Sequence, residues 1–422
     1  GTDPVDTDTD GGGRTDGQEV LYDGTDPVIA GDDEVPRFIT DGLSASDQAD
    51  MALDSQGNVH IVWIGGTDTA TPQVYYTMLS SSGQTLIDDA QISNNASAPQ
   101  WPSIDVDSLD RVHVVWQDGQ FSAGQAEIVH ECLDPYLDDR DGSSGVDMVM
   151  VIVDDHMISS DNGYISEHPL VAIDGLDRLH VVWCEVSAEI YEITYAAFDY
   201  SGTVEIAEQV VGNTYYGPAM DVDSTGAVHV LWAAYDQDVY STEIFYKMID
   251  GDDGTVLIDT TRLSPGGEST SWYPSVDIGA DDQVTVVFED NSADGACMMR
   301  IDPSLDSQDG DAADAGQIMV LESTLISQAD VSMAIMPSIA MDSQGNAHVS
   351  YYRCDSHWAF PPADLYVNTF DPSGTVLSAE RPLTDEPTAT TTGYFTVPVI
   401  VESHETVYVL WTDERRGRAE IM

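Results

Sequence analysis

One phrase recurs seven times along this chain and constrains its fold more than any other feature. It begins with an alternating stretch, passes through an Asp-x-x-Gly-type turn and ends in a β-branched stretch that closes on an aromatic residue, as in "MALDSQGNVHIVW" at residues 51–63. The closing aromatics are Trp63, Trp116, Trp183, Trp232, Phe288, Tyr351 and Trp411. They are 53, 67, 49, 56, 63 and 60 residues apart, a spacing typical of four-stranded units with loops of variable length.

Each repeat continues into a third strand and a weaker fourth strand. Examples of the third strand are "EIVHECLD", "EITYAAFD", "EIFYKMID" and "DLYVNTFD". Strand periodicity dominates throughout, and no segment shows a helical stripe. We therefore predict an all-β fold, a seven-bladed β-propeller of four-stranded blades over residues 37–422. The segment 37–40, "RFIT", is expected to supply the fourth strand of the last blade, which would close the ring and remove its exposed sheet edges.

The repeats resemble those of secreted β-propeller proteins of archaeal and bacterial surfaces, which are distantly akin to sialidase-like propellers. Their form is Pro-Ser-Ile-Ala-x-Asp-x-x-Gly-x-x-His-Val-x-Trp. The resemblance covers residues 37–422 and implies a seven-bladed propeller, but it implies no particular activity. The Asp-box of true sialidases, Ser-x-Asp-x-Gly-x-x-Trp, is a different turn, because Gly57 lies six residues before Trp63.

The charge balance predicts the medium in which the protein works. The chain has 76 acidic and 13 basic residues, a formal net charge of -63, and Lys247 as its one lysine. Such a surface repels itself unless salt or bound cations screen it. We expect an extracellular or cell-surface protein in a high-salt or calcium-rich medium. Nucleic acid and anionic membranes are poor partners, because both need a basic face, and no run is long enough to span a membrane.

The first 36 residues form an acidic tail or linker rich in Gly, Asp and Thr, in which "GTDPV" occurs twice. Its one strand-like stretch is "EVLY", which consists of Glu19, Val20, Leu21 and Tyr22. This stretch is predicted to add a strand to a neighbouring copy and so to build a homopolymer, although a tail folded back on its own propeller is the competing account. Asn95, in "NAS", is a predicted glycosylation acceptor.

Repeated polar residues are predicted to be structural. Five histidines lie three residues before the closing aromatic, where we expect each to bond a neighbouring backbone group: His60, His113, His180, His229 and His348. Five aspartates begin the turn, where a carboxylate can bond its own backbone two residues on: Asp54, Asp107, Asp174, Asp223 and Asp342. Gly57, Gly226 and Gly345 would supply the positive φ of that turn, which Asp110, Asp177 and Asp282 tolerate less well.

Three sets of carboxylates are candidate calcium ligands. Asp105, Asp221 and Asp277 share one first-strand position and would meet on a cation if that position faces the channel, although a solvated acidic channel is the alternative. The loop "DTDTDG" offers Asp6, Asp8 and Asp10, but Gly17 stands where a closing Glu is needed. An acidic insertion offers Asp302 and Asp306, which solvent alone would also explain. No haem or nucleotide motif is present.

Four cysteines predict two disulfides, Cys132–Cys184 and Cys297–Cys354. Each pair relates one blade to the next, from a third strand to a second strand, with separations of 52 and 57 residues. Such bonds would indicate an oxidising, extracellular setting. Four buried free thiols are the alternative.

No catalytic motif stands out from the repeat, so the leading functional prediction is a non-catalytic structural, adhesive or filament-forming surface subunit. Its partners would be identical copies or surface glycans. The alternative is a secreted carbohydrate-active enzyme, a glycoside hydrolase or lyase, with a carboxylate site at the channel mouth. Its sugar platforms would be Trp101, Trp272, Tyr273 and Trp358. The three converging arginines of a sialidase are not visible in the sequence.

Overall fold

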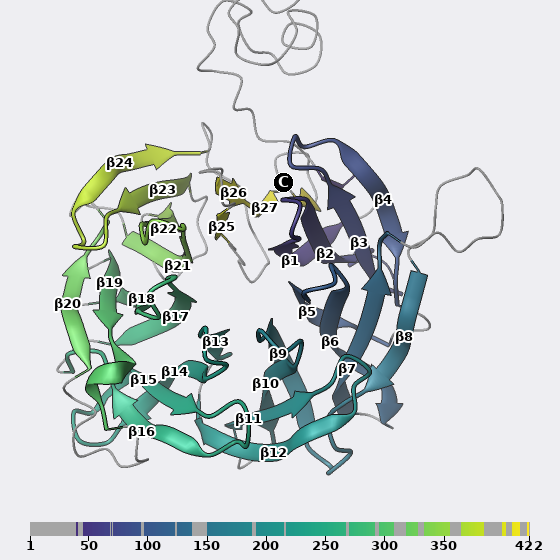
Figure 1. Ribbon diagram of the computed structural model, residues 1–422, viewed down its shortest axis with the longest axis horizontal. Coiled ribbons are helices and arrows are strands. Elements are labelled where there is room, and N and C mark those ends of the chain that lie inside the picture. Colours follow the sequence, from purple (N-terminus) through teal and green to yellow (C-terminus); the bar gives the residue numbers. More distant parts are fainter. Residues whose placement is uncertain are drawn as a thin grey trace, which may run out of the picture. The chain divides into compact units, whose positions relative to one another are not determined.

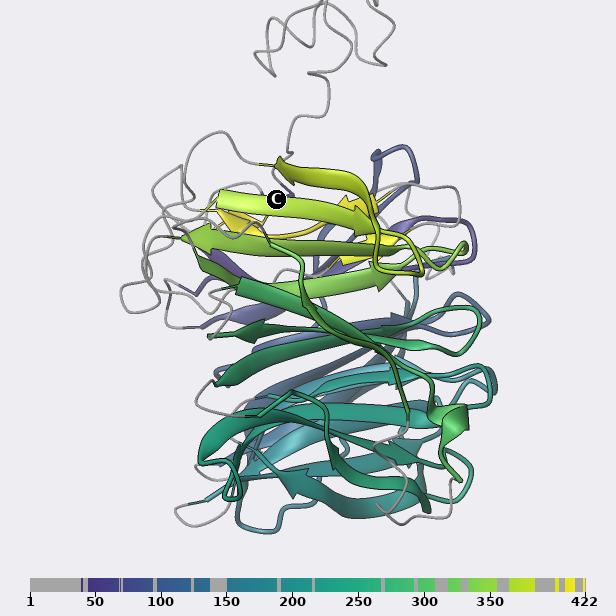
Figure 2. The same ribbon diagram turned by 90° about the vertical axis from the view of Figure 1, so that its left-hand side faces the viewer.

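Residues 40–421 form one compact β-propeller unit in the computed structural model (Figure 1). The structure describes residues 39–421 except 41–44, 68, 70, 94–96, 123–124, 137–149, 188–190, 215–216, 267–269, 292–294, 308–317, 328–332, 355–363, 384–398, 402–406 and 414–419. The edge-on view of Figure 2 shows the strands running from one face of the ring towards the other.

The first three blades are antiparallel four-stranded sheets whose strands follow chain order from the channel outward. Blade 1 contains β1 (Ser46–Leu53), β2 (Val59–Gly65), β3 (Gln73–Leu79) and β4 (Thr85–Gln91). Blade 2 contains β5 (Gln100–Val106), β6 (Val112–Ser122), β7 (Gln125–Asp134) and β8 (Met150–Met157). Blade 3 contains β9 (Ile165–Ile173), β10 (Leu179–Val186), β11 (Tyr191–Phe198) and β12 (Val204–Asn213).

The next three blades repeat this order. Blade 4 contains β13 (Ala219–Val222), β14 (Val228–Asp236), β15 (Ser241–Ile249) and β16 (Val256–Arg262). Blade 5 contains β17 (Ser271–Ile278), β18 (Val284–Asp290), β19 (Gly295–Ile301) and β20 (Met319–Leu325), with a 3₁₀ turn, η3 (Pro303–Leu305), before its last strand. Blade 6 contains β21 (Met333–Met341), β22 (Ala347–Cys354), β23 (Asp364–Phe370) and β24 (Val376–Pro382).

The predicted count of seven four-stranded blades is wrong, because the described residues form six. The seventh repeat instead supplies two pairs of short strands, β25 (Val399–Val401) with β26 (Val407–Val409) and β27 (Thr412–Asp413) with β28 (Glu420–Ile421). The repeated phrase encodes only a turn and the two strands beside it. It therefore predicts the first pair in every repeat, whereas completion of a sheet depends on later strands that the phrase does not specify.

The seventh repeat lies between blade 6 and blade 1. β25 contacts both β21 and β1. The Thr412 hydroxyl donates to Asp47 Oδ1 over 3.2 Å, and the backbone N–H of Ile421 donates to Thr40 Oγ1 over the same distance. Of the predicted closing strand 37–40, only Ile39 and Thr40 are described, and neither is in a strand. The ring is closed by these contacts.

The second strand of each blade forms the centre of the core. β2 and β18 are buried at every position. The closing aromatics of all six blades are at most 2% exposed: Trp63, Trp116, Trp183, Trp232, Phe288 and Tyr351. Apolar clusters extend from one blade to the next, so each blade completes its core only against its neighbour. Truncating one such Trp to Ala is expected to cost about 3–5 kcal/mol of folding free energy.

The repeated histidines are structural, as predicted, but their predicted backbone partner is wrong. In blade 3, His180 Nε2 lies 3.3 Å from Asp174 Oδ2, and its Nδ1 lies 2.9 Å from the Tyr195 hydroxyl. Side chains are the partners because the Asp that begins the turn accepts from the backbone N–H groups of the turn with Oδ1 and directs Oδ2 at the imidazole. Blades 1 and 4 hold the same trio, in Asp54, His60 and Tyr76 and in Asp223, His229 and Tyr246.

The two predicted disulfides are not formed in the structure, and Cys132, Cys184, Cys297 and Cys354 are buried as thiols. Cys132 faces its own blade, where its Sγ lies 3.9 Å from His113 Nε2. Burial raises the pKa of Cys132 and of Cys297 to about 12, so these thiols are protonated at neutral pH. No helix among the described residues is long and apolar enough to cross a membrane.

Candidate functional site at the channel mouth

A cavity of about 730 Å³ lies on the channel axis at one face of the propeller. Residues at the beginning of the innermost strands of all six blades line it, in β1, β5, β9, β13, β17 and β21 or just before them. The innermost strands contact one another around the ring. Each blade therefore presents the same structural position to one shared space.

In five of the six blades that position is a β-bulge, and it lies opposite the closing aromatic of the repeat. In blade 2, Gln100 pairs with Gln117 and Ser103 pairs with Val115, so Trp101 and Pro102 together oppose Trp116. The same shift of register occurs in blades 1, 3, 5 and 6. Proline lacks the N–H that a regular ladder requires, so it is well suited to a bulge.

Five bulges place a non-glycine residue in the left-handed region of backbone space. The residues and their φ angles are Gln48 (55°), Trp101 (54°), His168 (54°), Tyr273 (49°) and Met336 (51°). Each such conformation costs about 1–3 kcal/mol and persists only where the surrounding fold imposes it. All five residues line the cavity. The strain of these five bulges therefore lies at a position where the blades differ in side-chain chemistry.

The rings of Trp101 and His168 stack across the boundary between blades 2 and 3. Their centroids are 4.4 Å apart and the planes differ by 29°. The backbone N–H of Trp101 donates to Gln48 Oε1 over 2.8 Å, which connects the bulge of blade 1 to that of blade 2. These contacts fix the orientation of an aromatic wall of the cavity.

Glu167 lies beside this wall and is the centre of a polar trio. The Tyr191 hydroxyl donates to Glu167 Oε1 over 3.0 Å, and His168 Nδ1 lies 3.5 Å from the same oxygen. The interaction with His168, assisted by the Tyr191 hydroxyl, lowers the pKa of Glu167 against the opposing effect of burial. The side chains of His168 and Glu167 are 27% and 22% exposed, so both can reach a bound molecule.

Asp50 is a second carboxylate in the cavity lining. Its oxygens accept from the backbone N–H groups of Met51 and of Ile104 in the next blade. Burial raises the pKa of Asp50 to about 6, although these hydrogen bonds oppose the shift. The cavity therefore contains one carboxylate that stays ionised, Glu167, and one that holds a proton in mildly acidic solution, Asp50.

The three aspartates predicted to share a cation lie along the channel, and each caps the next blade. Asp105 accepts from Ile173 N, Asp221 from Ile278 N and Asp277 from Met341 N, over 2.7, 3.0 and 2.8 Å. They satisfy backbone groups on the free edges of innermost strands. Burial raises the pKa of Asp105 to about 7 and of Asp277 to about 6. Burial, together with the charge of Asp277, raises the pKa of Asp221 well above its usual value. A metal role for them stays a prediction.

The other predicted residues are dispersed. Trp272 packs against the core, whereas Tyr273 lines the cavity. Asp302 caps η3 by accepting from the Ser304 backbone N–H and hydroxyl, and Asp306 is buried at the end of that turn. Asp6, Asp8, Asp10, Glu19, Val20, Leu21, Tyr22, Asn95 and Trp358 lie outside the described residues.

Glu167, His168 and Tyr191 were not predicted from the sequence. A signal for His168 was present, because a variable residue precedes the recurrent proline at Trp101, His168, Tyr273 and Met336. No comparable signal marks Tyr191, which enters the cavity from the third strand of its blade. Tyr191 lies close to Glu167 because β9, β10 and β11 pair side by side in one sheet.

No protein-family model matches the sequence, and no curated protein is significantly similar to it. Solved structures share the fold. One is a protein of unknown function from Dyadobacter fermentans, 11% identical, covering 92% of this chain and 95% of its own, with a TM-score of 0.51. Two are structures of an ulvan lyase, a polysaccharide lyase, 9% and 10% identical, each covering 91% of this chain and 94% of its own, with TM-scores of 0.56 and 0.53. The former has -[GlcA(1-4)Rha3S]- bound.

These likenesses establish the β-propeller fold, and they correct the leading functional prediction. A non-catalytic structural, adhesive or filament-forming subunit is the wrong choice, because the structural neighbours with a stated activity act on polysaccharides. They bear out the alternative, a carbohydrate-active enzyme, better than that prediction. Nothing in the described part of the chain supports a homopolymer.

Proposed function

We propose that this protein is a carbohydrate-active enzyme that cleaves a glycan chain bound across the central cavity. The observation that carries the proposal is the polar trio at the cavity wall. An ionised Glu167 accepts from Tyr191, lies beside His168 and is next to the exposed edge of an aromatic wall. A glycan site needs this combination of apolar ring faces with a few convergent polar groups.

The aromatic residues of the cavity supply stacking surfaces for sugar rings. Trp101 and Tyr273 occupy the same bulge position in blades 2 and 5. The Trp101 ring is held by its stacking on His168, so little side-chain freedom is lost when a sugar binds to it. A glycan that spans the cavity would contact platforms on two sides of the ring.

Charge favours an uncharged glycan. The ionisable acidic and imidazole groups in the lining include Asp50, Glu167 and His168, and the chain as a whole carries a formal charge of -63. A negative field disfavours the approach of a uronate or sulfated chain of the kind bound to the ulvan lyase. Hydrolysis of a neutral polysaccharide suits this field better than elimination from a uronate.

Two carboxylates with oppositely displaced pKa values match the two roles of glycoside hydrolysis. The lowered pKa of Glu167 keeps it ionised, so we assign it as nucleophile or general base. The pKa of about 6 lets Asp50 hold a proton, so we assign it as the general acid that protonates the leaving oxygen. Tyr191 and His168 position Glu167 by binding its carboxylate.

The test is product analysis on a panel of uncharged and uronate-containing polysaccharides in molar sodium chloride. We expect new reducing ends from an uncharged glycan, without the ultraviolet absorbance of an unsaturated uronate. Unsaturated products would reassign the protein as a lyase, with Tyr191 and His168 as its proton-transfer groups. Tight binding without cleavage would make it a glycan-binding propeller.

We also propose that the protein works outside the cell in a high-salt or calcium-rich medium. The formal charge of -63 and the single lysine support this setting, because exposed carboxylates repel one another unless salt screens them. The unfolding midpoint should rise steeply between dilute buffer and molar sodium chloride. A midpoint independent of salt would count against the proposal.

A further inference from the structure

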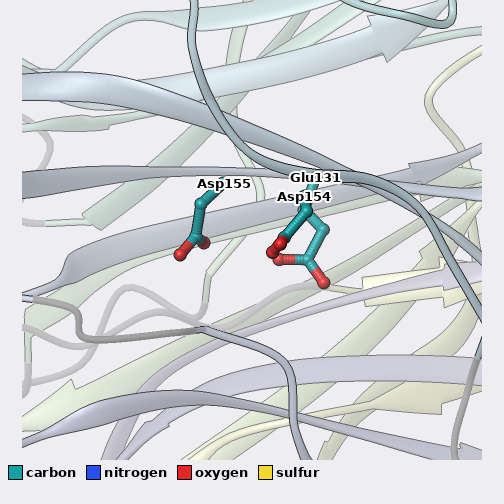
Figure 3. Close-up of side chains that lie close together, drawn as sticks. All are labelled: Glu131, Asp154 and Asp155. Atoms are coloured by element: carbon teal, nitrogen blue, oxygen red, sulfur yellow. The ribbon is translucent and has the colours of Figure 1, made fainter.

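Three carboxylates converge on the outer part of blade 2, away from the cavity. Glu131 lies on β7, and Asp154 and Asp155 lie on β8 (Figure 3). One ligand oxygen from each lies within 4.8 Å of the other two. Within the part of the chain that the structure describes, this is the one group of three or more acidic, His or Cys side chains that comes so close.

A second β-bulge brings the three together. His130 pairs with His156 and Cys132 pairs with Val153, so the two aspartates between them oppose Glu131 alone. Asp155 has a φ of 36°, in the left-handed region that a non-glycine residue adopts at a cost. Without the bulge, successive side chains of β8 would point to opposite faces of the sheet. The strained backbone of this bulge therefore brings three acidic side chains close together.

Glu131 is the member of the group that requires a partner. Its side chain is fully buried, and neither Oε1 nor Oε2 has a hydrogen-bond partner. An unpaired buried carboxylate is costly unless a proton or a cation neutralises it. Burial, and then the charges of Asp155 and Asp154, raise the pKa of Glu131 to about 9. These same neighbours are oxygen ligands already in place for a cation.

The equivalent bulge of blade 4 shows a cation in this place. Tyr246 pairs with Thr261 and Met248 pairs with Ile258, so Lys247 occupies the position of Glu131. The Lys247 ammonium lies 3.3 Å from Asp259 Oδ1, and Asp259 occupies the position of Asp154. In blade 4 the one lysine of the chain therefore forms an ion pair with the carboxylate of the bulge. Blade 2 has a third acid there, so a cation that neutralises it would have to come from solution.

We propose that Glu131, Asp154 and Asp155 bind one calcium ion, which takes the place that the Lys247 ammonium fills in blade 4. Calcium prefers six to eight oxygen ligands at about 2.3–2.6 Å, which three carboxylates, some bidentate, supply together with water. Two oxygens on opposite sides of such an ion are about 4.8 Å apart, and the three ligand atoms lie within that distance of one another. Asp154 is exposed, so the ion and its waters have a path to the site.

The test is calorimetric titration of the full chain with calcium chloride, after treatment with a chelator and in molar sodium chloride to suppress diffuse binding. Wild type should bind one calcium ion in a distinct phase. Glu131→Gln should weaken that phase at least tenfold. The matched control is Asp88→Asn, because Asp88 occupies the position of Asp154 in the bulge of blade 1, where Thr77 stands opposite. The control should bind as wild type does.

A second variant reproduces the arrangement of blade 4. Glu131→Lys should lose the calcium phase, yet in chelator its unfolding midpoint should match or exceed that of calcium-free wild type, because the ammonium meets Asp154 and Asp155. If Glu131→Gln does not fold, the same titration is made with Asp154→Asn, which changes the exposed ligand and should also weaken calcium binding. Equal calcium binding by wild type and the Glu131 variants would overturn the proposal. So would an equal loss in Asp88→Asn, which would reveal diffuse binding to the acidic surface.

Discussion

Ser108 donates two hydrogen bonds to Asp177, one from its backbone N–H and one from its hydroxyl, each 2.9 Å long. The bonds join the turn of blade 2 to the turn of blade 3. Asp177 adopts a φ of 62°, where glycine would be less strained. Ser55 with Asp110 and Ser224 with Asp282 repeat the contact between other neighbouring blades. Aspartate therefore replaces glycine in these turns to connect adjacent blades.

This contact predicts that the effect of Asp177→Gly on the free energy of unfolding depends on whether Ser108 is present. In wild type, Asp177→Gly should be neutral or destabilising by up to about 1 kcal/mol, because relief of strain offsets the two lost hydrogen bonds. With Ser108→Ala already present, the same change should stabilise by about 0.5–1 kcal/mol, since only the strain remains. Unfolding in guanidinium chloride measures each free energy. Identical effects in both backgrounds would show that the two residues are not coupled.

The histidine motif predicts a loss of stability without a loss of activity. His180→Leu leaves the Asp174 carboxylate and the Tyr195 hydroxyl without their buried partner, so it should cost about 2–4 kcal/mol in unfolding free energy. The imidazole lies near the turn that ends β9, whereas His168 lies in the first half of that strand. The rate of glycan cleavage per folded molecule should therefore be unchanged. A fall in that rate would place His180 in the catalytic machinery.

The propeller was predictable because its strongest signal is periodic and redundant. Each copy of the phrase specifies a turn, a buried second strand and an aromatic that fills the space between blades. The number of complete blades was not predictable, because β27 and β28 are only two residues long and the phrase does not encode them. The aspartates of the turns were explained only in part. Sequence gives their position, but not the serine of the preceding blade that binds them.

The site was less predictable, because it consists of non-repeated residues brought together by ring closure. Trp101 and Tyr273 were recognisable as aromatics beside the recurrent proline. The bulge that turns them into the cavity depends on the register between first and second strands, which sequence periodicity does not fix. Asp105 accepts from Ile173 N in the next blade, a contact that the sequence did not indicate. Unpaired strand edges have no signature in the sequence.

The channel aspartates predict a stability that declines as the solution becomes more alkaline. The pKa of Asp105 is raised from 3.8 to about 7 in the folded protein. Its favourable contribution is therefore complete below about pH 4 and is lost as pH rises through about 7. Asp105→Asn does not titrate and keeps an oxygen for Ile173 N. It should be more stable than wild type by roughly 1–3 kcal/mol at pH 8 and nearly equal to it at pH 4.

Chemical unfolding of both proteins between pH 4 and pH 8 measures this difference. Asp238→Asn, on an exposed turn, controls for the removal of one negative charge from a very acidic chain. If the difference in unfolding free energy between Asp105→Asn and wild type does not grow with pH, burial does not raise the pKa of the Asp105 carboxylate.

The aromatic wall predicts a separation of binding from chemistry. Trp101→Ala removes a stacking surface but no reacting group, so KM for the glycan should rise about tenfold while kcat changes little. Trp272→Ala, one position from Tyr273, removes a side chain packed against the core and should lower stability instead. Steady-state kinetics and thermal unfolding of both variants distinguish these roles. An unchanged KM in Trp101→Ala would exclude it as a sugar platform.

The central claim is that Glu167 in the channel mouth cleaves a glycan. Its most direct test is the cleavage rate of Glu167→Gln on the best polysaccharide of the panel, beside the matched variant Glu192→Gln, whose residue neighbours Tyr191 in the chain. The account predicts that Glu167→Gln folds normally and loses at least about 100-fold in kcat, whereas Glu192→Gln retains the wild-type rate. Equal rates for Glu167→Gln and wild type would contradict the account, because the reaction would then take place elsewhere.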